Sequence, residues 1–161
     1  MKRQTIFLLS ILLVAGCGKK EGQEAQFRGV QEKRDYAGEG LNYLKQKDIV
    51  RAIQSFDMAI RQEPTKVENY LTLGQVYLHL QQPARAADTV SAAIKVAPQN
   101  PDAYYILALS EAMDNKKDQA VEAAKKSAEL YAAIKNEEMF KKSVALVQGL
   151  SQPAQPATTT Q

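Results

Sequence analysis

Apolar and polar residues follow a helical period through most of residues 33–150. The clearest stretch holds two amphipathic segments, residues 67–80 and 84–96, which meet across Gln81-Gln82-Pro83. In each segment apolar side chains recur every three or four positions, as they do on one face of an α-helix. Pro98 follows the second segment, and proline cannot continue a helix. The pattern therefore predicts two helices joined by a short turn.

Residues of the same kind recur 34 positions before and after this helix pair. Each series holds an aromatic, a small residue or a proline: Tyr36, Tyr70 and Tyr104; Gly40, Gly74 and Ala108; Ala52, Ala86 and Ala120; Ala59, Ala93 and Ser127; Pro64, Pro98 and Ala132. Such self-similarity is typical of stacked helical repeats. We therefore expect an all-α solenoid of three helix pairs, at residues 33–66, 67–100 and 101–134.

Small residues in these series predict how the two helices of a unit pack. They allow the helix axes to approach to the short end of the usual 8–10 Å range, so Gly74 and Ala86 are expected to face each other. Asp48 and Asn100 are expected to cap the helices that follow them. The third unit lacks a stopping proline, and its second helix is expected to continue to about Lys135.

A last helix, residues 137–149, is predicted to cover the apolar end that a stacked array would leave exposed. Asn136 provides its start and Gly149 a plausible end. The side chains expected to face inward are Met139, Phe140, Val144, Val147 and Leu150, with Lys141, Lys142 and Gln148 outside. Residues 151–161 contain no large apolar residue, which predicts a disordered tail.

The N-terminal segment has the pattern of an export signal. Lys2 and Arg3 precede an uncharged run at residues 5–15, which is too short to span a ~30 Å hydrocarbon core. Val14-Ala15-Gly16-Cys17 then resembles the lipobox of bacterial lipoproteins. The resemblance implies a signal peptide at residues 1–16, lipidation of Cys17 and a tether at residues 17–32. Gly18, where Asp would favour the inner membrane, implies the outer membrane in a Gram-negative cell. An ordinary secretory signal or an uncleaved anchor is the alternative.

Composition and single residues argue against several function classes. Without Lys2 and Arg3 the basic side chains nearly balance the 18 acidic ones, so no electrostatic footprint for nucleic acid remains. Cys17 is the only cysteine and His79 the only histidine, and neither has a cluster of metal-ligating residues near it in the sequence. We therefore expect no enzyme, no cofactor and no metal site.

The repeats resemble the tetratricopeptide repeat. Counted from Lys33, Val67 and Pro101, that pattern has an aromatic at position 4, glycine at 8, tyrosine at 11, alanine at 20 and 27, an aromatic or large apolar residue at 24, and proline at 32. The first two units match it nearly throughout. The third departs from it at Glu111, Ala124, Ser127 and Ala132.

This resemblance implies a concave groove lined by the first helix of each unit. The groove residues carried over are Leu41, Leu44, Leu71, Gln75, Leu78, His79, Tyr105, Leu109 and Met113. They lack the lysine and asparagine pairs with which some family members clamp a terminal carboxylate, so such a receptor is disfavoured. The alternative is that neighbouring helices bury these side chains against each other.

The function expected from these features is that of a lipid-anchored adaptor or assembly factor in the bacterial cell envelope. Its partner would be an apolar or helical segment of another envelope protein. One alternative is a structural homo-oligomer, joined through residues 139–150 or through the groove. A small-ligand carrier or an enzyme is the other alternative, and it would need a polar pocket that the sequence does not indicate.

Overall fold

The computed structural model describes residues 33–152, of which residues 35–152 belong to one compact unit. The predicted signal peptide, Cys17, the tether and nearly all of the predicted tail lie outside the described residues. Within 33–152 the secondary structure is entirely helical: α1 (Tyr36–Lys45), α2 (Ile49–Gln62), α3 (Val67–His79), α4 (Pro83–Val96), α5 (Pro101–Met113), α6 (Lys117–Ala133) and α7 (Glu137–Ser151). None of these seven helices has the length and apolar character that crossing a membrane requires.

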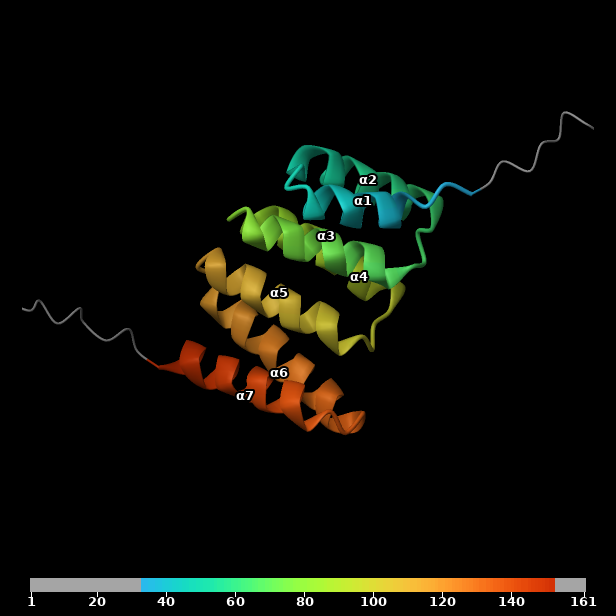
Figure 1. Ribbon diagram of the computed structural model, residues 1–161. Helices are drawn as coiled ribbons and strands as arrows, with labels where there is room; N and C mark the ends of the chain where they lie inside the picture. Colours follow the sequence, from blue (N-terminus) through green and yellow to red (C-terminus); the bar gives the residue numbers. More distant parts are fainter. Residues whose placement is uncertain (1–32, 153–161) are drawn as a thin grey trace, which may run out of the picture. The chain divides into compact units, whose positions relative to one another are not determined.

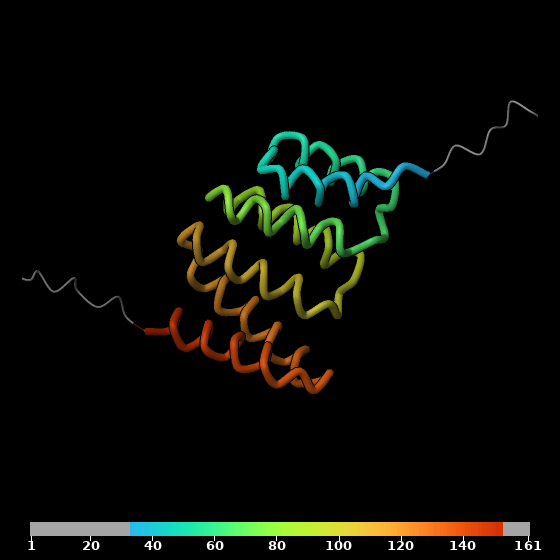
Figure 2. Tube along the Cα trace, viewed as in Figure 1, coloured from blue at the N-terminus to red at the C-terminus, as the bar shows by residue number. Residues whose placement is uncertain are grey.

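The helices form an α-solenoid, as predicted. The pairs α1–α2, α3–α4 and α5–α6 follow one another along the stack, and α7 packs on α6 at its end (Figure 1). The trace in Figure 2 shows that α1, α3, α5 and α7 run in the same direction. Because α3 also contacts α5, the first helices of the second and third pairs lie side by side. This arrangement creates the surface on which the predicted groove residues lie.

One type of turn joins the two helices of every pair. Its central residue has a left-handed backbone, with φ of 60° at Lys47, 58° at Gln81 and 59° at Asn115. The next N–H donates to the carbonyl five residues back, as from Asp48 to Tyr43 at 2.9 Å, which closes the end of the helix. Lys135 adopts the same conformation between α6 and α7. The last helix is therefore attached by the turn that elsewhere joins the two helices of one repeat.

The predicted helix starts are confirmed by the capping bonds. Asp48, Asn100 and Asn136 each accept a hydrogen bond from the backbone N–H three residues later, at 3.0–3.1 Å. Asp35 does the same for α1, which was not predicted. The predicted end at Gly149 was wrong, because α7 continues to Ser151. Glycine ends a helix when it takes a positive φ, and no described glycine does so.

Within the pairs, the predicted small residues are buried where the helices meet, and Gly74 lies against the Ala86 backbone as predicted. A Cβ atom built on Gly74 would lie 2.5 Å from Val90 Cγ1 and 3.8 Å from the Ala86 carbonyl oxygen. Val90, one turn beyond Ala86 on α4, is thus the side chain that fills the space left by Gly74. Ala86 also belongs to a buried cluster that includes Phe56 and Leu73.

The helix α7 covers the end of the array with Val147, as predicted, but not with all of the predicted residues. Phe140 was predicted to face inward but is 38% exposed, because it lies in the first turn, beside the α6–α7 turn. Ser143 is fully buried instead, with its Oγ 3.0 Å from that of Ser127 on α6. Leu146 and Val147 pack against a small-residue cluster on α5 and α6. The inward stripe of α7 therefore runs through Ser143, Leu146 and Val147.

Candidate functional site

The nine predicted groove residues all lie on first helices of the repeats. Leu41 and Leu44 lie on α1, and the remaining seven lie on α3 and α5 (Leu71, Gln75, Leu78, His79, Tyr105, Leu109 and Met113). We call the surface formed by these nine residues the groove face. Leu41 is 48% exposed and Met113 is 39% exposed, and Gln75 and His79 are exposed as well. The other five are half-buried.

Five of these residues meet at one hollow of about 360 Å³ at the ends of α3 and α5. Gln75, Leu78 and His79 come from α3, and Leu109 and Met113 come from α5. Gln81 is the sixth lining residue, and it lies in the α3–α4 turn with a left-handed backbone. The sequence placed Gln81 in the turn but not in the site, because its residue type does not reveal the left-handed backbone. The hollow is lined by apolar and uncharged polar side chains.

Three of the predicted groove leucines also belong to the core. Leu44 and Leu78 pack against the buried cluster around Phe56 and Tyr77. Leu71 packs against a second cluster, formed by residues on α3, α4 and α5. The packing alternative therefore holds for these leucines, and the groove assignment stays a prediction. Gln75, His79 and Met113 are exposed at the rim of the hollow, whereas the leucines also form the outer layer of the core.

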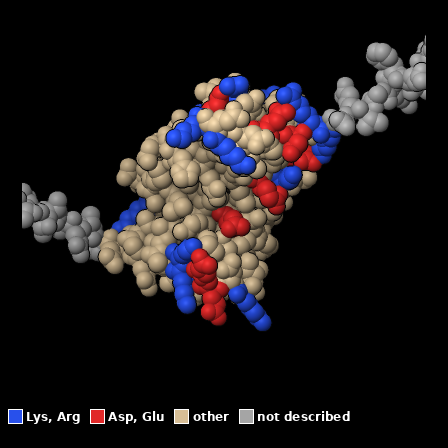
Figure 3. All heavy atoms as spheres, viewed as in Figure 1, with Lys and Arg blue, Asp and Glu red and all other residues tan. Residues whose placement is uncertain are grey.

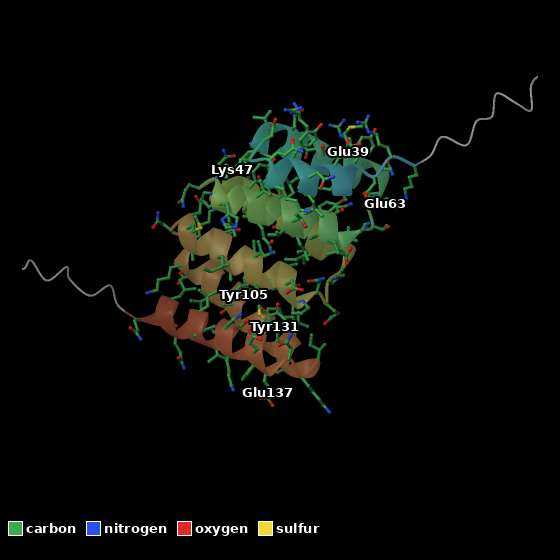
Figure 4. The ribbon with its side chains drawn as sticks, in the orientation of Figure 1. Glu39, Lys47, Glu63, Tyr105, Tyr131 and Glu137 are labelled. Carbon is green, nitrogen blue, oxygen red and sulfur yellow. The ribbon has the colours of Figure 1, made fainter. Side chains whose placement is uncertain are left out.

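Tyr105 is on α5 and lies near Tyr131, at the end of α6 (Figure 4). Tyr131 is buried, and its hydroxyl donates a hydrogen bond to the Asp102 carboxylate at the start of α5. Burial, together with this carboxylate, raises the pKa of the Tyr131 phenol. On α7, Lys142 forms an ion pair of 2.7 Å with Glu138, which raises the pKa of the lysine. The bond between Tyr131 and Asp102 joins α6 to α5. The ion pair between Lys142 and Glu138 lies on α7, near Tyr105.

A second hollow, of about 460 Å³, lies between α5 and α6, beside Tyr104 and Leu107. Two charged side chains at its edge already have partners. Glu122 pairs with Lys125, and Lys126 pairs with Glu129, each at 3.0 Å. In the described part of the chain no three His, Cys, Asp or Glu side chains gather as metal ligands would. The groove face is therefore the stronger candidate site.

The surface over the groove face is largely uncharged. Figure 3 shows uncharged atoms over most of α3 and α5, and acidic side chains toward the ends at which these helices begin. The contact between arginine and tyrosine that joins the two helices of the second repeat lies outside this surface. Arg85 stacks on the Tyr77 ring at 4.2 Å and donates to its hydroxyl at 2.7 Å, next to the turn. The chemistry available on this face is therefore apolar contact and neutral hydrogen bonding.

Comparisons with known proteins point to one fold. The sequence profile described as "Tetratricopeptide repeat" matches residues 43–110. The TPR2B domain of yeast Sti1, in complex with pHsp70, has 20% identity and a TM-score of 0.67, over 73% of this chain and 94% of that one. The structure of PcrH, in complex with the chaperone binding region of PopD, has 16% identity and a TM-score of 0.67, over 72% and 88%.

A third solved structure is the second TPR domain of human RPAP3, in complex with the HSP70 peptide SGPTIEEVD. It has 16% identity and a TM-score of 0.65, over 74% of this chain and 94% of that one. No curated protein matches the sequence significantly. The TM-scores establish a shared fold, and at these low identities the likeness shows the fold alone.

Proposed function

We propose that this chain, a tetratricopeptide repeat protein, is a lipid-anchored adaptor or assembly factor of the bacterial cell envelope. It binds a segment of another protein on the groove face. The observation that carries the proposal is the hollow at the ends of α3 and α5, with Gln75, His79 and Met113 exposed at its rim. An exposed apolar side chain beside a hollow with neutral walls is suited to an apolar partner side chain.

The solved structures of the same fold support this proposal. By their titles, yeast Sti1 and human RPAP3 are in complex with pHsp70 and an HSP70 peptide, and PcrH is in complex with a region of PopD. The present groove face differs from a receptor for a terminal carboxylate. The nine residues of the groove face include no lysine, arginine or asparagine. We therefore propose an internal, apolar segment as the bound element.

The anchor rests on Cys17 and the three residues before it, Val14-Ala15-Gly16. Two or more acyl chains would hold the protein at a membrane, because each buried methylene contributes about 0.8 kcal/mol. Gly18 favours the outer membrane if the cell is Gram-negative. Cells that express the wild-type chain or Cys17→Ser should be labelled with a clickable palmitate analogue. Label on the wild type alone supports the anchor, and an unlabelled wild type would contradict it.

Partner binding is tested by crosslinking in intact envelopes, followed by purification of the chain. Met113→Glu and His79→Glu place a carboxylate at the rim of the hollow, where burial against an apolar partner is costly. Both residues are exposed, so folding stability should not change. Val50→Glu on α2 is the matched control, since Val50 is 68% exposed and lies away from the groove face. A crosslinked protein that survives both rim variants would place the binding surface elsewhere.

The same experiment also tests the homo-oligomer. A crosslinked product that contains only a second copy of the chain would favour self-association over the adaptor function. Sedimentation of the purified chain then gives the number of copies.

A further inference from the structure

The groove face has chemically different ends along α3 and α5. The hollow, with Leu78, His79 and Met113 in its wall, lies where both helices end. Glu68 and Asp102 are the second residues of the same two helices, and both are exposed. Because α3 and α5 run in the same direction (Figure 2), their first turns, and with them Glu68 and Asp102, lie at one edge of the face. The face is thus acidic at one end and apolar at the other.

Acids in the first turn are found in every helix on the side of the stack that carries the groove face. A carboxylate in the first turn stabilises any helix through the helix dipole. Yet α2 and α4, which lie outside the groove face, have no acidic residue in the first turn. Acids occupy the first turn of all four helices on the other side of the stack, α1, α3, α5 and α7. Outside the face, acids at helix starts are Asp118 of α6 and the N-cap Asp48 of α2, which pairs with Arg51.

One of the two carboxylates is free to bind a cation. Asp102 accepts the hydrogen bond of the buried Tyr131 hydroxyl, which holds its side chain in place. Within residues 33–152 the Glu68 carboxylate has neither a hydrogen bond nor an ion pair. Glu68 lies on α3, the helix that supplies half of the hollow. A partner that fills the hollow and continues along α3 would reach this carboxylate.

We propose that the segment bound on the groove face is an amphipathic α-helix with a lysine or arginine in its last turn. This inference rests on the proposed function and adds the chemistry and direction of the partner. The helix lies along α3 and α5 and opposite to them in direction, so that its apolar side chains enter the hollow and its last turn meets Glu68.

The dimensions and dipoles fit such a helix. Residues 68–79 of α3 span about 16 Å, which equals about three turns of a bound helix. Along this length the side chains of the two helices form ridges spaced by three or four residues, against which a third helix packs. In the antiparallel direction the partial negative end of the bound helix lies at the partial positive ends of α3 and α5. A cation in its last turn is then favoured by its own helix and by Glu68.

The test is a display selection in which the full chain is presented with a library of helical sixteen-residue peptides. Expected winners carry apolar residues at i, i+3 or i+4, and i+7, and basic residues enriched in the last turn over the first. Selection against Glu68→Gln should lose the basic enrichment and keep the apolar pattern. Selection against Glu122→Gln, an exposed acid on α6, should give the wild-type result.

Affinities measured by fluorescence anisotropy complete the test. Replacing the last-turn arginine of a selected peptide with glutamine should weaken binding to the wild type about two- to fivefold. The same replacement should change nothing with Glu68→Gln, and high salt should abolish the difference. Basic enrichment in the first turn, acidic enrichment, or proline-rich extended winners would overturn the inference alone. Winners whose affinity is unaffected by Met113→Glu and His79→Glu bind elsewhere and would overturn the proposed function as well.

Discussion

The pairing of helices within a repeat is tested most directly at Gly74. A Cβ atom added there would lie 2.5 Å from Val90 Cγ1, about 1 Å closer than ordinary contact. Val90 is fully buried and β-branched, so it has essentially one rotamer in a helix and no space to move into. Overpacking of this kind costs about 1–3 kcal/mol. Alanine in place of glycine returns about 1 kcal/mol of helix propensity, so Gly74→Ala should destabilise by up to about 2 kcal/mol.

Gly149→Ala separates these two contributions. Nothing lies within 4 Å of the position where its Cβ would be, so the variant should gain helix propensity, up to about 1 kcal/mol, and meet no clash. The difference between the two variants therefore measures the overpacking. In a Val90→Ala background the clash is removed, and Gly74→Ala should become neutral or stabilising. The free energy of unfolding is measured by urea denaturation with circular dichroism. The packing described here is refuted if Gly74→Ala stabilises as much as Gly149→Ala.

Further predictions concern the end of the array. Tyr131→Phe removes the hydrogen bond to Asp102 and should cost about 1 kcal/mol near neutral pH. The pKa of Tyr131 is raised in the folded protein, so an unfolded chain loses this proton first, near pH 10, and stability falls as the pH rises further. Urea midpoints measured across this range should fall less in Tyr131→Phe, and equal slopes would contradict the assignment. Asn136→Ala removes the bond from the Met139 N–H and should cost about 1 kcal/mol in the same denaturation assay. An unchanged midpoint would mean that water replaces this cap.

The helix pairs could be predicted because each depends on residues close together in the sequence. Periodic apolar positions, the caps at Asp48 and Asn100 and the prolines that end helices all act within a few residues. The turns between paired helices were harder to predict. Their central residues, Lys47 and Gln81 among them, take a left-handed backbone without glycine. The hydrogen bonds that close each turn offset the cost of that conformation, and residue types do not reveal them.

The predictions that failed concerned contacts between residues of different helices. The rotation of α7 is set by Ser143 against Ser127 and by Leu146 against α5 and α6. An apolar stripe counted on an isolated helix treats serine as an outward residue and places Phe140 inside. The bond between Tyr131 and Asp102 joins positions 29 residues apart that share no repeat position. The one available signal was Ser127, which replaces the alanine of the first two units and needs a polar partner when buried.

The groove face shows why a repeat pattern alone does not separate binding residues from packing residues. Leu78 both lines the hollow and packs against the core, so the floor of the site is the outer layer of the fold. A substitution at such a residue changes binding and stability together. A loss of partner capture could then come from the lost contact or from the weakened fold. Gln75 and Met113 line the hollow and are exposed at its rim. Because a side chain there can change without opening a cavity in the core, the rim is where recognition can be altered while the fold is kept.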